Sequence, residues 1–213
     1  MSAARVAQVA AELLVKGGYA ATTMADVAAA AEVSVPWLYK VFGPKPALVK
    51  RAYDVLLSGG ADRVPLGQRP AFRALAAQND PHRAIEHYAA ISRDLITRVG
   101  PLATVLLSAA RSADPDLAFL AATINRERLI GATAFTDHLA ELGALKPGVT
   151  RQQARDVVWT LISPDVYRML VLERGWSGRR YEQWLTRSLI SAVLGPDRPV
   201  GGAVPSSPMK DLD

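Results

Sequence analysis

Apolar residues recur at helical spacing along almost the whole chain, and no segment shows the alternation of a convincing strand. In the first segment these residues fall at i, i+3, i+4, i+7 and i+8, on one face of a helix: Val6, Val9, Ala10, Leu13 and Leu14. Gly17 and Gly18 end this helix, because glycine accepts the left-handed conformation common at helix C-termini. The pattern predicts an all-α fold.

Two short capped helices with a tight turn between them follow in the next two dozen residues. Thr23 and Asp26 have the spacing of a capping box, which starts the first of them. Ser34 is a good N-cap for the second, and Pro36 stands in its first turn, where no N–H partner is needed. This order predicts a helix-turn-helix, whose second helix enters the DNA major groove.

The rest of the chain also has helical spacing, interrupted by glycine and proline. A fourth helix is expected from Pro44 to about Leu57, and the breakers within residues 58–80 indicate a junction between two units. Further helices are expected over residues 71–77, 81–99, 101–112, 115–142, 151–174 and 178–194. Residues 157–172 are apolar on nearly every side, which predicts a helix buried all round and kinked at Pro164.

Composition excludes several classes of protein. The chain of 213 residues is 50% apolar and has no cysteine, so disulfides, thiol catalysis and thiolate zinc sites are excluded. The three histidines have no metal-ligand spacing, and no nucleophile elbow or phosphate-binding glycine loop is present. We therefore expect no enzyme activity, no cofactor and no metal site.

Charge and hydropathy add less. The net charge of +5 is compatible with phosphate binding, but residues 1–61 hold six Lys/Arg against four Asp/Glu. No signal peptide is expected at the N-terminus, and apolar runs stop far short of the ~18 residues that a membrane span needs. These features predict a cytoplasmic protein.

Residues 7–48 resemble the N-terminal domain of the TetR family of one-component transcription regulators. The matching residues are Ala10, Gly18, Tyr19, Thr22, Thr23, Asp26, Val27, Ala28, Ala31, Val33, Ser34, Leu38, Tyr39, Phe42, Lys45, Ala47 and Leu48. Beyond them, SPDVYRMLVLERGWS followed by YEQWL is similar to the C-terminal helix pair of many such regulators. The resemblance implies a homodimer that binds a palindromic DNA operator and responds to a small-molecule effector.

The chain is accordingly divided into four parts. They are a three-helix helix-turn-helix DNA-binding domain at 1–46, a connecting helix at 47–60, a helical ligand-binding and dimerisation domain at 61–195, and a flexible tail at 196–213.

The second helix of the motif has an unusually apolar reading edge. Val35, Pro36 and Trp37 suit contact with thymine methyl groups, while Lys40 suits guanine or phosphate. Packing of Trp37 on a neighbouring helix is the alternative to DNA contact, and both stay open. Hydroxyl and amine groups nearby suit phosphate contact. The residues expected to contact DNA are Thr22, Thr23, Ser34, Val35, Pro36, Trp37, Tyr39, Lys40 and Lys45.

Two features depart from the family pattern. Glu32 stands in the turn where the family commonly has glycine, and a non-glycine residue at positive φ costs roughly 1–2 kcal/mol. Its carboxylate would also repel phosphate. The basic arm that often precedes the first helix is reduced to Arg5, so minor-groove contact from an arm is not expected.

In the C-terminal part, aromatic residues at long-helix positions are the candidate pocket lining, with ordinary core as the alternative. They are Tyr88, Phe119, Phe135, His138, Trp159 and Tyr167. Few charges interrupt the apolar stripes, which favours an apolar or mildly polar effector. The resemblance implies a dimer interface in the last two helices, with intrachain core as the alternative, at Val157, Leu161, Tyr181, Trp184, Leu185, Leu189 and Val193.

The function expected from these observations is that of a DNA-binding repressor released by a small apolar effector. A second hypothesis is a helical small-molecule-binding or interaction dimer whose DNA-binding head is degenerate. It is motivated by Glu32, by the missing arm and by the weak local charge.

Overall fold

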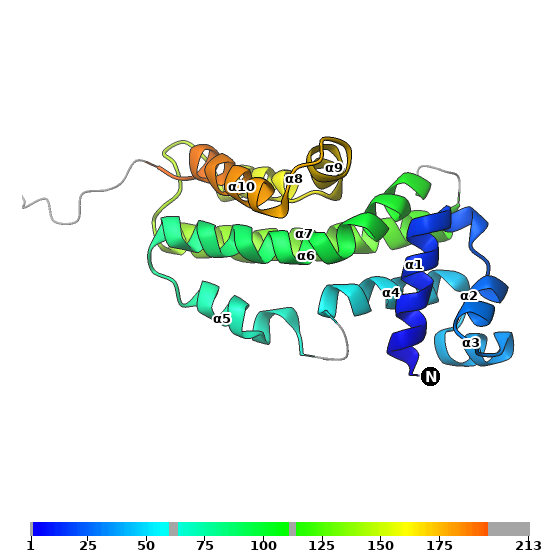
Figure 1. Cartoon of the computed structure of the whole chain (residues 1–213). Coiled ribbons are helices and arrows are strands. Elements are labelled where there is room, and N and C mark those ends of the chain that lie inside the picture. Colours follow the sequence, from blue (N-terminus) through cyan, green and yellow to red (C-terminus); the bar gives the residue numbers. More distant parts are fainter. Residues whose placement is uncertain (1, 60–63, 111–113, 196–213) are drawn as a thin grey trace, which may run out of the picture.

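The computed structural model describes residues 2–59, 64–110 and 114–195, and the regular elements within them are all helical (Figure 1). The elements are α1 (Ala3–Ala21), α2 (Met24–Ala30), α3 (Val35–Phe42), α4 (Lys45–Ser58), the 3₁₀ turn η1 (Leu66–Gln68), α5 (Pro70–Ala76), α6 (Pro81–Ala109), α7 (Pro115–Glu141), α8 (Arg151–Leu161), α9 (Pro164–Tyr167), the π-helical η2 (Arg168–Glu173) and α10 (Gly178–Val193). The expected all-α fold is confirmed. The tail expected at residues 196–213 lies outside the described residues.

The helices form a small head and a layered body. Figure 1 shows α2 and α3 at one end of the molecule beside α1, while α6 and α7 run side by side through its middle. The helices α8, α9 and α10 cover one side of that pair, and α4 and α5 lie on the other side. Because α6 contacts α1, α4, α5, α7, α9 and α10, it is the central helix of the core.

The helix α1 joins the head to the body through its small and apolar face. Val6, Ala10 and Leu14 from the predicted stripe are at most 1% exposed. The small alanine side chains of α1 allow neighbouring helices to approach it closely, and α1 packs against both α4 and α6. At Gly18 the backbone leaves the helical conformation with φ 80°, as expected of glycine near a helix end.

The break expected at residue 100 is wrong, because α6 continues through Pro101 as one helix. A proline at this position removes the hydrogen bond to the carbonyl of Thr97. Packing on both sides of it outweighs that loss, since Val99, Leu102 and Leu106 are all buried. Burial of the residues around Pro101 therefore outweighs the sequence signals for a helix end.

The single helix expected over residues 151–174 is also wrong, because α8 ends at Leu161 and a new helix begins. Ser163 is the N-cap of α9 and accepts a hydrogen bond from the Val166 N–H at 3.2 Å, and Pro164 occupies the first turn. Proline is tolerated there, so it starts a helix rather than kinking one. The stretch is not buried all round either, because Met169 and Leu172 are 44% and 49% exposed.

Gly100 allows the closest approach in the body. A Cβ atom at this position would lie 2.7 Å from two ring carbons of Tyr167, which packs on α6 from α9. The Tyr167 ring is 5% exposed and also contacts the Tyr181 ring edge-on, at 5.8 Å between centroids. The ring is therefore held from two sides, and a methyl group at residue 100 has no room.

No helix among residues 2–59, 64–110 and 114–195 is both long and apolar enough to cross a bilayer.

Replacing Gly100 by alanine is expected to lower the free energy of unfolding by about 1–3 kcal/mol, because the new methyl group overpacks the contact with Tyr167. The matched control is Gly131→Ala on α7, where nothing lies within 4 Å of the new Cβ. This control is expected to raise stability by roughly 0.5–1 kcal/mol through helix propensity. Urea unfolding of both variants measures the difference, and equal stabilisation by both would contradict the tight approach.

Candidate DNA-binding surface and ligand cleft

The N-terminus of α2 is fixed by the predicted capping box. The Thr23 hydroxyl accepts a hydrogen bond from the Asp26 N–H at 3.1 Å and donates one to Asp26 Oδ2 at 2.6 Å. The same oxygen accepts from the Thr23 N–H at 2.7 Å. These hydrogen bonds lower the pKa of Asp26, so the residue remains a carboxylate at the exposed start of α2.

The turn between α2 and α3 is a Schellman-type C-cap. The Val33 N–H donates to the Ala28 carbonyl at 3.0 Å, and the Glu32 N–H donates to the Ala29 carbonyl at 3.2 Å. This pattern requires a left-handed residue, and Glu32 supplies it with φ 52°. Among the described residues Glu32 is the only non-glycine residue at positive φ, as the departure from the glycine pattern predicted.

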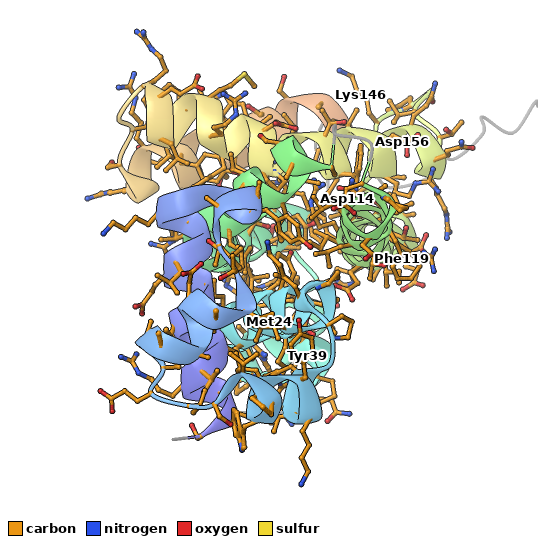
Figure 2. All side chains as sticks on the ribbon, turned by 90° about the vertical axis from the view of Figure 1, so that its right-hand side faces the viewer. Met24, Tyr39, Asp114, Phe119, Lys146 and Asp156 are labelled. Carbon is orange, nitrogen blue, oxygen red and sulfur yellow. The ribbon has the colours of Figure 1, made fainter. Side chains whose placement is uncertain are left out.

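The helix α3 is anchored on one face and exposed on the other. Ser34 caps it by accepting a hydrogen bond from the Trp37 N–H at 3.2 Å, and Leu38 is fully buried. Tyr39 is 52% exposed, and Figure 2 shows it on the outside of the head, at the end of the molecule far from Lys146. The outer side of this helix is therefore available to a partner.

Trp37 makes its ring contact within its own helix and keeps part of its surface, so its contact with DNA stays a prediction. Its ring packs edge-on against Phe42, with 6.1 Å between centroids, and the residue is half-buried. Val35 is half-buried as well, whereas Pro36 and Lys40 are exposed. The exposed part of α3 thus combines an apolar N-terminal turn with one lysine.

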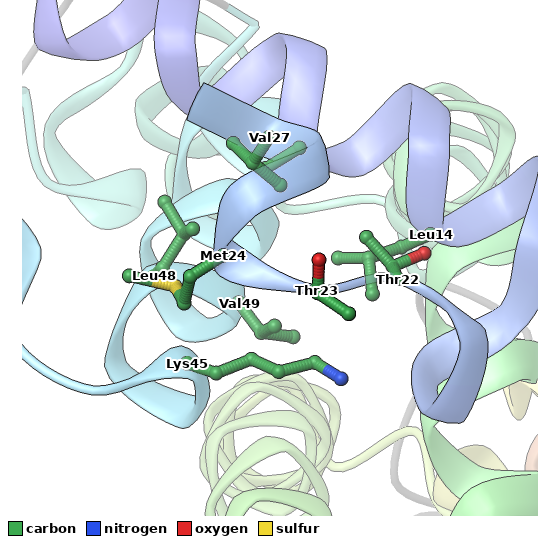
Figure 3. A pocket seen from close by; sticks show the side chains of 9 residues that line it. Leu14, Thr22, Thr23, Met24, Val27, Lys45, Leu48 and Val49 are labelled. Carbon is green, nitrogen blue, oxygen red and sulfur yellow. The ribbon is translucent and has the colours of Figure 1, made fainter. Parts of the chain in front are cut away.

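Two of the residues expected to contact DNA instead hold the head together in this structure. Thr22 is 5% exposed and donates its hydroxyl hydrogen to the Gly18 carbonyl at 2.9 Å. The Lys45 amine donates to the Tyr19 carbonyl and lies 3.9 Å from the centroid of the Tyr19 ring. Figure 3 shows the Lys45 side chain extended beneath Thr23 along a small, mostly apolar cavity. Burial lowers the pKa of Lys45.

The aromatic residues expected to line one pocket lie in different places. Tyr88 and Phe135 are buried and stacked on each other, with 3.8 Å between their centroids. His138 Nε2 is hydrogen-bonded to the Gln78 carbonyl at 2.9 Å. Phe119 is 74% exposed on the outer face of α7 (Figure 2). These four residues and Tyr167 therefore do not form a common site.

Of the six expected residues, Trp159 lines a cleft in the body. The cleft has a volume of about 380 Å³ and lies among the end of α6, α7, α8 and the start of α9. Its lining residues are Leu107, Ala110, Ala121, Asn125, Arg128, Trp159, Thr160, Ser163, Pro164 and Asp165. Sequence analysis missed the polar members, because an isolated Arg or Asn on a long helix does not differ from a solvated residue.

Four of the residues expected at the dimer interface require a correction. Tyr181, Leu185, Leu189 and Val193 are all 0% exposed within a single chain. The helix α10 packs this stripe against α6 and α8, so it is intrachain core, which was the alternative interpretation. The other three expected residues, Val157, Leu161 and Trp184, are half-buried and keep some surface.

Lys50 connects the head side of the molecule to the body. The Lys50 amine lies 2.9 Å from Glu127 Oε1 on α7 and also pairs with Asp54 on its own helix. Burial lowers the pKa of Lys50, but its hydrogen bonds to Asp54 and Glu127 raise it more, and the net shift is upward. The amine therefore stays charged and links α4 to α7.

Comparisons with known proteins agree with this architecture. Residues 7–52 match the family model described as bacterial regulatory proteins, tetR family. A search of curated proteins gives no match.

Solved structures resemble the chain over nearly its whole length. The secondary repressor NalD of the MexAB-OprM multidrug efflux pump in Pseudomonas aeruginosa is 20% identical, with a TM-score of 0.67 over 90% of this chain and 96% of that one. The regulator FadR from Bacillus subtilis, in complex with stearoyl-CoA, is 15% identical, with a TM-score of 0.70 over 88% and 97%. A putative regulator from Saccharomonospora viridis, in complex with choline, is 12% identical, with a TM-score of 0.67 over 91% and 98%. These likenesses show a shared fold.

Replacing Glu32 by glycine is expected to raise the free energy of unfolding by about 0.5–1 kcal/mol. The left-handed conformation costs a residue with a Cβ atom roughly 1–2 kcal/mol, and the greater freedom of glycine in the unfolded chain offsets part of that gain. Glu32→Gln is the matched control, since it removes the charge and keeps the Cβ atom. Urea unfolding distinguishes them, and equal stabilisation by glutamine would assign the cost to charge rather than backbone.

Proposed function

We propose that the protein is a homodimeric, DNA-binding transcriptional repressor released by a small-molecule effector, since residues 7–52 match the model of the tetR family of bacterial regulatory proteins and the whole chain is similar in fold to such regulators. In this proposal residues 1–46 bind DNA, and residues 61–195 bind the effector and form the dimer. Residues 47–60 form the helix that connects these two domains.

The exposed face of α3 is the observation that carries the proposal. A helix of 8 residues is about 12 Å long and fits the major groove, which is about 12 Å wide. Val35, Pro36 and Trp37 would contact thymine methyl groups, and Lys40 would reach guanine or phosphate.

Contacts with the DNA backbone would come from groups around α3. Thr23, Ser34 and Tyr39 are exposed and have hydroxyl groups, which suit phosphate contacts that fix position without reading sequence. Lys45 would reach phosphate only after leaving the Tyr19 carbonyl. Thr22 is left out of the proposed contacts, because its hydroxyl is buried.

Two reading heads need a dimer, because half-sites of a palindrome repeat about 34–36 Å apart. We propose that the partner packs on the outer faces of α8 and α10, where Val157, Leu161 and Trp184 keep exposed surface. The buried stripe of α10 supports these faces from inside and does not itself reach a partner.

The effector would act by changing the spacing of the two heads. The helix α4 leads directly from the head into the body and is tied to α7 by the Lys50–Glu127 ion pair. A ligand that binds better to one arrangement of α4 and α7 shifts the equilibrium by that difference in affinity and by no more. A change of a few ångströms between heads would break the match to two major grooves.

A second candidate is a helical small-molecule-binding or interaction dimer with a degenerate head. It is favoured by the left-handed Glu32 and by the inward orientation of Lys45. The carboxylates of Asp26 and Glu32 are both exposed on the head and would repel phosphate.

Binding to the DNA that flanks the protein's own gene, compared with a random duplex at fixed salt, tests the main proposal. We expect tighter binding to the flanking DNA and a steep loss of affinity with rising salt, since each phosphate contact releases counterions. Equal affinity for both duplexes would refute sequence-specific repression. A flat response to salt, or no binding at all, would favour the second candidate.

Replacing Lys40 by alanine is expected to weaken DNA binding in one of two distinguishable ways. Loss of a phosphate contact lowers the salt slope by about 1, whereas loss of a guanine contact costs roughly 1–3 kcal/mol and relaxes specificity at one position. Lys146→Ala removes the same charge at the opposite end of the molecule and should change neither quantity (Figure 2). If Lys40→Ala leaves the DNA affinity, the salt slope and the specificity unchanged, the proposed role of α3 in contacting DNA is contradicted.

The Lys50–Glu127 pair is tested by a double-mutant cycle on operator affinity. Lys50→Met and Glu127→Gln are each expected to change the Kd by about two- to fivefold, or roughly 0.5–1 kcal/mol for a partly exposed pair. The double variant should differ little from either single one, because both remove the same link between α4 and α7. Arg51→Met, at the neighbouring position, is the charge control. Additive effects would show that the pair does not position the head.

A further inference from the structure

Arg128 carries a positive charge inside the body and donates hydrogen bonds to neutral groups. Its Nη1 donates to Asn125 Oδ1 at 2.9 Å, and its Nη2 donates to the Trp159 carbonyl at 2.7 Å. Both acceptors are neutral. Arginine nevertheless stays protonated in proteins. The cleft therefore has in its wall a cation that makes these two hydrogen bonds to neutral groups, and the Asp165 carboxylate of the same lining acts on it electrostatically.

The guanidinium also has unused hydrogen-bond donors. It has five N–H groups, and its Nε is buried with no acceptor in the protein. The buried hydroxyl of Tyr181 likewise has no protein partner. Tyr181 and Tyr88 both interact electrostatically with Arg128, so these polar groups share one region of the core. Buried donors without acceptors are costly, and an oxygen acceptor placed on the Arg128 guanidinium, which lines the cleft, would reduce that cost.

The remaining walls of the cleft suit an apolar body attached to that acceptor. Leu107, Ala110 and Ala121 form an aliphatic side. The Trp159 ring lies 4.9 Å from the guanidinium carbon of Arg128, measured to its centroid, and provides a flat aromatic surface next to the charge. A cleft of about 380 Å³ is within the usual range for small-molecule sites.

Asp165 at the edge of the cleft restricts the number of negative charges. Its carboxylate lies 3.9 Å from Arg168 Nε. It also interacts electrostatically with the Arg128 guanidinium. A second anionic group on a ligand would approach this carboxylate and be repelled. The charges around the cleft therefore favour one anionic group over two.

From these observations we propose that the cleft binds a small organic monocarboxylate, with its carboxylate on the Arg128 guanidinium and its apolar part against Trp159. The role of this ligand as effector rests on the proposed function, whereas its binding does not. The expectation of an apolar or mildly polar effector is thereby narrowed to an amphipathic anion. The site is well placed to act on α4, because Arg128 directly follows Glu127, the partner of Lys50.

Binding is tested on the full chain by calorimetry and thermal unfolding with benzoate and octanoate. Their neutral amides, benzamide and octanamide, and the dianion phthalate are the comparison probes. We expect saturable binding of both monocarboxylates at millimolar concentration or below, and binding roughly tenfold weaker or worse for the amides and phthalate, since charge-assisted hydrogen bonds are the stronger ones.

Arg128→Met is the decisive variant, and it should abolish the preference for acid over amide. It removes a buried charge whose hydrogen bonds go to neutral groups, so the fold is expected to persist. Arg126→Met removes the same charge from an exposed position two residues earlier and should bind as the wild type does. Thr160→Tyr fills the cleft without touching the charge and should weaken acids and amides alike.

Equal binding of acids and amides, no saturable binding of either acid, or unchanged binding by Arg128→Met would each overturn the proposal. Operator binding is measured separately on the same preparations. Selective acid binding without operator binding would leave the cleft assignment standing and refute the regulator. Operator binding without acid binding would refute the cleft assignment and leave the proposed regulator standing.

Discussion

Close packing around α6 is the constraint on which the rest of the structure depends. This helix contacts α1 from the head side, α10 and α9 from the outer layer, and α7 along its length. Gly100 and the alanines at 84, 89 and 103 leave space for these neighbours. Since interiors tolerate neither voids nor overlaps, the position of the head relative to the cleft follows from how α1 and α4 sit on this one helix.

Much of the fold was predictable, because helix ends depend on local chemistry. The capping box of Thr23 and Asp26, the cap at Ser34 and the left-handed conformation at Glu32 all follow from a few neighbouring residues. The local rules failed at Pro101, whereas the new helix at Pro164 follows from a local signal, the Ser163 N-cap. Whether a proline starts, kinks or merely interrupts a helix depends on burial beyond its own turn, as the continuous α6 shows.

The candidate functional residues also divide into those that nearby residues predict and those that depend on packing between distant segments. Exposure of Tyr39 and Lys40 follows from the anchoring of Leu38 on the opposite side of α3. In contrast, an apolar stripe such as Tyr181 to Val193 has the same spacing whether it faces its own chain or a partner, so the sequence could not assign it. Arg128 was missed for a related reason: only the packing of α8 on α7 turns it from a surface charge into a cleft residue.

The inward bond of Lys45 has a consequence for selectivity among DNA sites. A lysine already paired with the Tyr19 carbonyl and ring must give up those contacts before it can approach phosphate. That internal competition weakens attraction to every duplex, because the phosphate contribution does not depend on sequence. Binding would then rely more on what α3 gains from base edges. In the proposed complex an occupied Lys45 amine would thus lower the affinity for all sites by about the same factor, and the ratio between a matching site and the many others would be set by the base contacts of α3.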